Sequence, residues 1–349
     1  MTDLTFSAPG ILLRGRGLTF DDVLIVPSKS AVRSRKDPEL KTRVTKRFNL
    51  ELPMISANMD TVTESSMAIA MHELGGLGIL HRFMGIEQQV AEVTKVKKAG
   101  ARLIAASIGV NDEGMERAGA LVRAGCNILT IDIAHGHSIA MSEMLTRLRT
   151  EFGSDVDLIA GNVATPEATR DLIEAGADAI KVGIGPGSMC TTRIITGCGV
   201  PQLTAIAWAV DVARTHGVPV IADGGLKSSG DIMKAFAAGA ETVMLGSLLS
   251  GTLETPGEIH NGKKFYRGMA SRSAQVSWRG QLPEGMAPEG ESTAVPVKGR
   301  VKDVILELAG GVRSGMSYVN AAALAEIPER ARFIEMSAAG YRESGAHGV

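Results

Sequence analysis

The sequence predicts a closed (β/α)8 barrel, from three observations. The sequence contains eight short apolar runs, and helical patterns lie between them. A short alanine-glycine repeat precedes four of the runs, where a helix would end and a strand begin. The chain has 349 residues, which a barrel of this type can accommodate as one unit. We expect residues 1–349 to form a single catalytic domain, with a flap or lid region inserted after the eighth strand at residues 251–296.

The eight apolar runs lack the alternation of polar and apolar residues that a half-exposed strand shows. Parallel strands that are buried on both faces have this composition. The runs are Leu52–Met59, Gly76–His81, Leu103–Ile108, Ile128–Ile133, Leu158–Val163, Ala179–Ile184, Val218–Ala222 and Thr242–Leu248.

Helical patterns separate these runs, for example Ile86, Val90 and Val93. Thr165-Pro166 has the composition of a helix start, with an N-cap residue before a proline. An Ala-Gly-Ala or Ala-Gly-Cys triplet precedes four runs, at residues 99–101, 124–126, 175–177 and 238–240, as expected where a helix ends before a strand. An open doubly wound sheet is the alternative, but no Gly-x-Gly-x-x-Gly follows the first run.

The charge balance argues against nucleic acid and anionic membranes as partners. Lys and Arg number 37 and Asp and Glu 38, which gives a formal net charge of -1. No apolar run reaches the length of a membrane span, and the start of the chain lacks the basic and apolar segments of a signal peptide. The three cysteines are scattered, as is typical of proteins in a reducing compartment. We therefore expect a cytoplasmic protein.

Polar and glycine-rich residues follow nearly every apolar run, where the active sites of (β/α)8 barrels lie. Asp132 and Asn162 lie at the ends of the fourth and fifth runs. Asp223-Gly224-Gly225 and Gly246-Ser247 follow the seventh and eighth. These glycines suit a phosphate held by backbone N–H groups and a helix N-terminus, although they could instead only form turns.

The loop after the sixth run, Gly183–Arg193, carries the strongest chemical signal. Its glycines permit a tight, carbonyl-exposing turn that could hold an anion or a monovalent cation. Cys190 is followed by two hydroxyl residues and by Arg193, and such neighbours favour the reactive thiolate. From the chemistry alone, a nucleophilic Cys190 and an unreactive Cys190 both remain open.

Other conspicuous residues have structural interpretations. We expect Cys126 and Cys198 to have packing roles, because Cys126 opens a buried strand and Cys198 lies in a Gly-Cys-Gly turn. His135 and His137 could form a metal pair, but no third ligand follows at zinc-like spacing, so turn contacts are the better interpretation. Trp278 belongs to no motif.

With the Gly183–Arg193 loop, the sequence resembles the IMP dehydrogenase/GMP reductase family over nearly the whole chain. Other matching segments are Leu18–Leu24, Ser56–Ser65, Asp223–Gly225, Tyr266–Met269 and Gly310–Met316. The resemblance implies a (β/α)8-barrel oxidoreductase that assembles as a homotetramer and acts on a purine mononucleotide, GMP or IMP.

The resemblance also assigns roles to residues. Cys190 would add to C2 of the purine, while Thr192 and Glu289 would manage protons. Glu289 could also accept a hydrogen bond from a purine ring nitrogen. The remaining mononucleotide contacts would come from Ser188, Asp223, Gly224, Gly225, Gly246, Ser247, Tyr266, Gly268, Met269 and Ala270. NADPH, or NAD, would be bound by Asp132, Ile133, Ala134, Asn162 and Gly183. K⁺ would be held by Gly185, Gly187 and Cys190, with Glu343, Ser344 and Gly345 of a neighbouring subunit completing its site.

Two features differ from most dehydrogenases of the family. The CBS modules that those enzymes carry after the second strand are absent, because Val96–Ala101 passes directly into the next strand. The flap is short and lacks the Arg-Tyr pair whose arginine activates water. In its length and its Gly268–Ser271 start it is most similar to GMP reductases. Because residues 251–296 show little periodicity, we expect little regular structure there.

The flap therefore favours NADPH-dependent reductive deamination of GMP to IMP and ammonia. The alternative is an IMP dehydrogenase that converts IMP, NAD and water to XMP and NADH with a shortened flap. Gly246-Ser247 supports that alternative, since many reductases have Gly-Gly there. A third hypothesis, an inactive nucleotide-binding relative, is disfavoured because Cys190, Thr192, Asp132 and Glu289 are all present.

Overall fold

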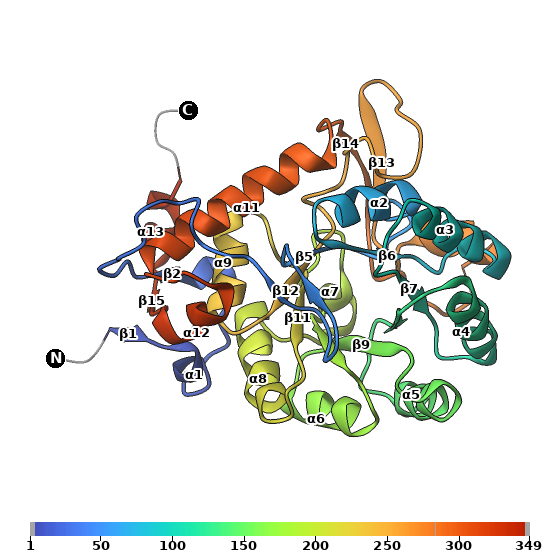
Figure 1. Ribbon diagram of the computed structural model, residues 1–349, viewed down its shortest axis with the longest axis horizontal. Coiled ribbons are helices and arrows are strands. Elements are labelled where there is room, and N and C mark those ends of the chain that lie inside the picture. Colours follow the sequence, from blue (N-terminus) through green and yellow to red (C-terminus); the bar gives the residue numbers. More distant parts are fainter. Residues whose placement is uncertain (1–3, 283, 346–349) are drawn as a thin grey trace.

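Eight parallel strands close into a barrel in the order in which they occur along the chain (Figure 1). The structure is a computed structural model, and it describes residues 4–282 and 284–345. The barrel strands are β5 (Met54–Ser56), β6 (Leu77–Leu80), β7 (Ala105–Ile108), β8 (Ile128–Asp132), β9 (Asp157–Val163), β10 (Ala179–Val182), β11 (Val220–Asp223) and β12 (Thr242–Leu245). Each strand overlaps one of the eight apolar runs, so the predicted (β/α)8 barrel is confirmed.

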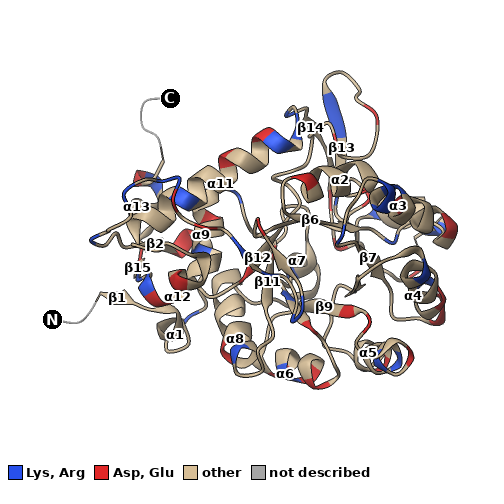
Figure 2. Cartoon of the chain, in the orientation of Figure 1, with Lys and Arg blue, Asp and Glu red and all other residues tan. Residues whose placement is uncertain are grey.

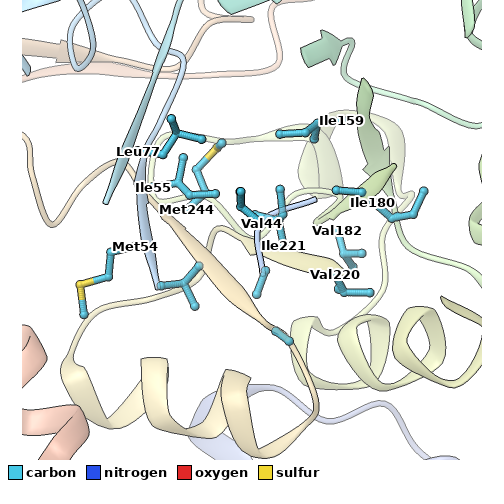
Figure 3. Close-up of a cluster of buried hydrophobic side chains, with 14 of the residues drawn as sticks. Val44, Met54, Ile55, Leu77, Ile159, Ile180, Val182, Val220, Ile221 and Met244 are labelled. Carbon is cyan, nitrogen blue, oxygen red and sulfur yellow. The ribbon is translucent and has the colours of Figure 1, made fainter. Parts of the chain in front are cut away.

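Aliphatic side chains fill the barrel and the layer between its strands and helices. Ile55, Ile159, Ile180 and Ile221 are fully buried and lie within one cluster (Figure 3). In β6 all four residues are buried, which explains why its sequence shows no polar alternation.

A hairpin covers the amino-terminal end of the barrel. Its strands are β3 (Thr42–Arg43) and β4 (Asn49–Leu50), and its turn carries Val44, which is fully buried among the barrel side chains (Figure 3). The Lys46 amide donates to the carbonyl of Asp178, just before β10, at 3.1 Å. The opposite, carboxyl end is therefore the end at which a ligand can approach the strands.

Helices surround the barrel (Figure 1). They are α2 (Ser65–Glu73), α3 (Ile86–Lys98), α4 (Asp112–Ala124), α5 (Ile139–Phe152), α6 (Pro166–Glu174), α8 (Gln202–Thr215), α9 (Ser229–Ala237) and α11 (Val301–Tyr318), with the short α7 (Thr192–Thr196) following β10. The predicted start of α6 is confirmed, since the Thr165 hydroxyl accepts from the Ala168 amide at 3.2 Å. The glycines of the four repeated triplets have φ values of +90°, +117°, +109° and +104°, a conformation that favours glycine.

The two ends of the chain meet in a small sheet beside the barrel. It pairs β1 (Thr5–Phe6) and β2 (Val23–Ile25) with the central β15 (Phe333–Glu335). The short helices α1 (Ala8–Ile11), α12 (Ile327–Arg330) and α13 (Ala338–Glu343) and the 3-10 turns η1 (Phe20–Asp22) and η2 (Leu324–Glu326) complete the fold. Figure 2 shows residues of both charge signs along α3, α4 and α5. Among the helices of the described ranges, none has the length and apolar character needed to cross a membrane.

Our expectation of little regular structure at 251–296 was wrong. This segment contains β13 (Lys263–Arg267), α10 (Arg272–Arg279) and β14 (Ser292–Pro296), and the two strands pair in antiparallel fashion. The inward positions of β13 include Lys264, whose ammonium donates to the carbonyls of Leu253 at 3.1 Å and Thr255 at 2.6 Å. Because this inward position holds a lysine, β13 does not show the alternation of apolar and polar residues by which a half-buried strand is recognised in a sequence.

Candidate active site

A cavity of about 320 Å³ opens at the carboxyl end of the barrel and reaches to the flap. All the residues that we expected to contact either nucleotide line it. They are Ser188, Cys190, Thr192, Asp223, Gly224, Gly225, Gly246, Ser247, Tyr266, Gly268, Met269, Ala270 and Glu289, and Asp132, Ile133, Ala134, Asn162 and Gly183. Gly185 and Gly187 of the expected K⁺ loop line it as well. Glu343, Ser344 and Gly345 do not, and a single chain does not test their expected place beside a neighbouring subunit.

Cys190, Thr192 and Glu289 form a hydrogen-bonded chain in this cavity. The Cys190 thiol lies 3.2 Å from the Thr192 hydroxyl, which donates to a carboxylate oxygen of Glu289 at 2.7 Å. A thiol, a hydroxyl and a carboxylate in contact can carry a proton between the sulfur and the carboxylate.

Backbone pairing between the flap and the cysteine loop brings Glu289 to this position. The Thr191 amide donates to the carbonyl of Glu289 at 3.1 Å, and the Glu291 amide donates to the carbonyl of Met189 at 2.8 Å. Between these bonds lies Gly290, where a Cβ atom would come within 3.1 Å of the Met189 carbonyl oxygen. Sequence spacing gives no indication of this pairing, because the paired residues lie about a hundred positions apart.

An ion pair anchors the base of the flap to the barrel. The Arg267 guanidinium at the end of β13 contacts the Asp60 carboxylate, with Nε 3.0 Å from Oδ2. The same guanidinium donates to the carbonyl of Ser273 in α10 at 2.9 Å. Both partners of the ion pair are largely buried, so the flap meets the rim at a fixed point.

Lys181 lies on β10 and lines the cavity, and the sequence analysis did not single it out. Its ammonium is 3.0 Å from Asp132 and 2.7 Å from Asp223, and it also donates to the Asn162 side chain. The Asn162 amide in turn donates to the Gly183 carbonyl at 2.8 Å and to Asp223 at 2.9 Å. The signal that could have revealed it is a lone lysine within an apolar run, because a buried ammonium needs carboxylate or carbonyl partners.

These contacts change the ionisation of the buried groups. Burial acts to raise the pKa of Asp132, but attraction to Lys181 and Arg82 outweighs it, and the pKa lies below its usual value. Burial acts to lower the pKa of Lys181, but the two carboxylates outweigh it, and the pKa is raised. Asp132 is therefore a carboxylate and Lys181 an ammonium near neutral pH.

The Tyr266 hydroxyl defines another wall of the cavity. Tyr266 is 4% exposed, burial raises the pKa of its phenol, and the hydroxyl forms a hydrogen bond with Ser188. A Cβ atom at Gly246 would come within 3.2 Å of that hydroxyl. No helix follows Gly246 directly, contrary to our expectation of a helix N-terminus there. Instead, the Leu249 and Ser250 amides turn back to the Gly246 carbonyl at 3.1 and 3.0 Å.

The outer part of the cavity is lined by two arginines and two aromatic rings. Phe83, after β6, meets Trp278 of α10 edge to face, with 6.1 Å between ring centroids. Arg82 lies over the Phe83 ring, and its Nε atom has no hydrogen-bond partner among the described residues. Burial lowers the pKa of Arg82, and the nearby Arg279 acts in the same direction. Trp278, which belonged to no motif in the sequence, thus forms part of the cavity wall.

Cys126, Cys198, His135 and His137 do not line the cavity. Cys126 is buried and its pKa is raised by burial, whereas Cys198 is exposed. His137 pairs with Asp171 at 2.8 Å, and the described residues contain no group of three or more His, Cys, Asp or Glu side chains that could hold a metal ion. The buried Cys126 agrees with the packing role expected for it, whereas the expected packing role of Cys198 was wrong, because its side chain is exposed.

A barrel whose cavity lies at the carboxyl end and is lined by a cysteine, carboxylates and glycine-rich turns is typical of barrel enzymes with a phosphate-binding site. Residues 17–347 match the family model described as "IMP dehydrogenase / GMP reductase domain". The chain belongs to this family and is an oxidoreductase.

Similar proteins carry both of the family's names. An inosine-5′-monophosphate dehydrogenase from Cryptosporidium parvum is 42% identical, with 96% of each chain covered. A GMP reductase from Leishmania major is 36% identical, with 95% of this chain and 97% of that protein covered. A solved GMP reductase from Trypanosoma brucei, in complex with guanosine 5′-monophosphate, superposes with a TM-score of 0.90 at 34% identity, covering 97% of this chain and 99% of that one.

The chain is shorter than some relatives with which it aligns over most of its length. The alignment with the Leishmania protein extends over 477 positions, although this chain has 349 residues. In the structure α3 ends at Lys98 and β7 begins at Ala105, so only a short loop separates them. The predicted absence of CBS modules is confirmed.

Proposed function

We propose that this enzyme catalyses the reductive deamination of GMP to IMP and ammonia, with NADPH as the reductant. The observation that carries the proposal is the contact of Thr192 with both Cys190, at 3.2 Å, and Glu289, at 2.7 Å. Release of ammonia requires proton delivery beside the sulfur, and this arrangement provides it. The GMP-bound T. brucei reductase, with a TM-score of 0.90, supports GMP as the ligand of the cavity.

In the first chemical step the Cys190 sulfur forms a bond to C2 of GMP and the bond from C2 to the exocyclic nitrogen breaks. The thiol proton passes through Thr192 and Glu289 to that nitrogen, which leaves as ammonia. A thioimidate between Cys190 and the purine remains. When bound, NADPH supplies the hydride that forms the C2–H bond of IMP and releases the Cys190 thiolate. Asp223 and Tyr266 would hold the ribose and phosphate, and Asp132 and Asn162 would place the dinucleotide.

The cavity also contains groups suited to a phosphorylated dinucleotide. Arg82 and Arg279 both line its outer part, and among the described residues neither forms an ion pair with a carboxylate within 4.0 Å. Guanidinium groups bind phosphate through paired N–H donors. The two arginines therefore support NADPH, which carries one phosphate more than NADH.

The second candidate is IMP dehydrogenation, which is favoured by the position of Arg279 in the wall of the cavity. Hydrolysis of the thioimidate needs a base that holds and deprotonates water. Between Met269 and Glu289 the flap carries Arg272 and Arg279, and Arg279 lines the cavity. The 42% identity to the C. parvum dehydrogenase also favours this candidate. We place it second because Arg279 is not followed by a tyrosine.

K⁺ and a tetramer belong to the same proposal. Among the described residues, no hydrogen bond reaches the carbonyl oxygens of Gly185 and Cys190, whereas the carbonyl of Gly187 accepts from the Cys190 amide at 3.0 Å. Carbonyl oxygens are the ligands that K⁺ takes in proteins. These carbonyls would hold the ion, which would stabilise the loop that presents Cys190, and a neighbouring subunit would supply Glu343, Ser344 and Gly345.

The assay that tests the function compares two substrate pairs on the purified enzyme. With GMP and NADPH we expect the nicotinamide absorbance to fall and one ammonia to be released for each NADPH oxidised. With IMP and NAD we expect NADH formation to be at least about a hundredfold slower, because the flap sequence lacks the Arg-Tyr pair whose arginine would activate water. Rapid formation of XMP and NADH, without GMP-dependent oxidation of NADPH, would establish the dehydrogenase instead.

A further inference from the structure

Lys181 joins two carboxylates that belong to different parts of the cavity. Its side chain is 3% exposed, and its ammonium lies 3.0 Å from Asp132, at the end of β8, and 2.7 Å from Asp223, at the end of β11. The third acceptor is the side-chain oxygen of Asn162 on β9. An ammonium has three N–H donors, so these three acceptors use all of them.

The two carboxylates face different ligands. Asp223 continues into the left-handed Gly224 and Gly225, and a Cβ atom at Gly224 would come within 2.9 Å of Pro186 in the cysteine loop. Asp132 continues into Ile133 and Ala134 and lies on the side of Arg82, whose charge acts on it. Under the proposed function, on which this inference rests, Asp223 binds the mononucleotide and Asp132 binds the dinucleotide.

The shared ammonium makes the position of one carboxylate depend on the other. Lys181 is held within the barrel, and its donors cannot move toward one carboxylate without leaving the other. A nucleotide hydroxyl that fixes Asp223 therefore also restricts Lys181 and, through it, Asp132. The second nucleotide then meets a site that is already ordered, and binding loses less conformational entropy.

We propose that Lys181 is a positioning residue that couples the binding of the mononucleotide to the binding of the dinucleotide. It touches neither reacting atom and acts through Asp132 and Asp223. The quantity that measures this role is the coupling factor, which we define as the ratio of the NADPH dissociation constants without and with bound mononucleotide. By linkage, the same factor describes the effect of NADPH on the mononucleotide.

The experiment uses IMP and NADPH, a pair between which no hydride is transferred, and calorimetry on the full chain. For the unaltered enzyme we expect saturating IMP to tighten NADPH binding by about fivefold or more, the lower end of couplings between sites. In Lys181→Met, which removes the ammonium but keeps the length of the side chain, we expect the factor to fall to about one. Lys181→Arg, whose guanidinium can still bridge two carboxylates, should restore most of it.

Lys264→Met is the matched control. Lys264 is also a buried lysine, at 4% exposure, but its ammonium contacts the backbone carbonyls of Leu253 and Thr255 rather than a carboxylate. Its loss should lower the midpoint of thermal unfolding while leaving the coupling factor as it is. If Lys181→Met does not fold, Asp132→Asn, which removes one of the two bridged charges, should also bring the factor to about one.

Three results would overturn the inference. They are a coupling factor of one in the unaltered enzyme, an unchanged factor in Lys181→Met, or, where that variant does not fold, an unchanged factor in Asp132→Asn. Failure of the proposed function is seen separately, since IMP and NADPH can show coupled binding whether or not GMP is reduced. If the enzyme does not oxidise NADPH with GMP but loses coupling in Lys181→Met, the proposed GMP reduction is refuted. The proposed coupling role of Lys181 is then supported.

Discussion

Three cysteines of this chain show how the surroundings determine what a thiol can do. Cys126 is buried among apolar residues, and burial raises its pKa, which disfavours the nucleophilic thiolate. Cys198 is exposed but lies outside the cavity. Cys190 alone of the three lines the cavity, and its sulfur contacts Thr192. The sequence singled out Cys190 because it lies in a loop of distinctive composition, while its role as a nucleophile stays a prediction.

Glu289 provides a test at the level of a single side chain. We expect Glu289→Gln to slow ammonia release from GMP by about a hundredfold, the lower end of acid–base contributions. The amide can still accept a hydrogen bond from Thr192, but it cannot carry a proton. The affinity for IMP, measured by calorimetry, should change by less than about threefold, within about 0.7 kcal/mol.

Glu284→Gln is the control for this prediction. Glu284 also lies between a proline and a glycine, but its side chain is exposed and is not part of the cavity wall. Its loss should leave the rate within about twofold, as is usual for surface substitutions far from a site. Equal rates for the two variants would exclude Glu289 as the proton carrier.

At the level of elements, the barrel could be predicted because each strand carries its own signal. In β6 the apolar run and the buried strand coincide, since both faces are covered. The flap could not be predicted in this way. The inward lysine in β13 hides its period, and α10 is a short polar helix whose visible signals are its cap Ser271 and its terminal Gly280 with φ of +79°.

Contacts between elements were the part that sequence could not supply. The bond between Thr192 and Glu289 depends on the pairing of the flap with the cysteine loop, and the family resemblance, rather than spacing, brought these residues together. The contacts of Lys181 with two carboxylates were not predicted, because the run Ala179–Ile184 was assigned as a strand from its apolar residues alone. A polar side chain within a buried strand indicates hydrogen-bond partners on neighbouring strands, because buried polar groups are nearly always hydrogen-bonded.

At the level of the whole molecule, the proposed K⁺ site would combine residues of two subunits. The segment that leads into α13 is tied to the end of η1, where the Met336 amide donates to the carbonyl of Asp22 at 2.8 Å. Glu343, Ser344 and Gly345 do not line the cavity of the same chain. Under the proposed function, a neighbouring subunit would bring these residues to the glycine-rich loop that ends at Cys190.

A chain that ends at Arg342 tests this assembly. We expect it to need about tenfold more K⁺ for half-maximal GMP-dependent oxidation of NADPH, a loss of about 1.4 kcal/mol in ion binding. Titration with K⁺, with Li⁺ as the control ion, measures the effect, and thermal unfolding in parallel checks that the shortened chain is folded. If neither the ion nor the truncation changes the rate, the K⁺ site is excluded.

The central claim is that the reaction passes through a covalent bond to Cys190, and its most direct test is the turnover of Cys190→Ala. The rate of IMP formation from GMP and NADPH should fall by about a thousandfold or more, because no other group in the cavity can form the thioimidate. GMP should still bind, as calorimetry would show, and Cys198→Ala should keep most of the parent activity. A Cys190→Ala enzyme that forms IMP within tenfold of the parent rate would contradict the covalent mechanism.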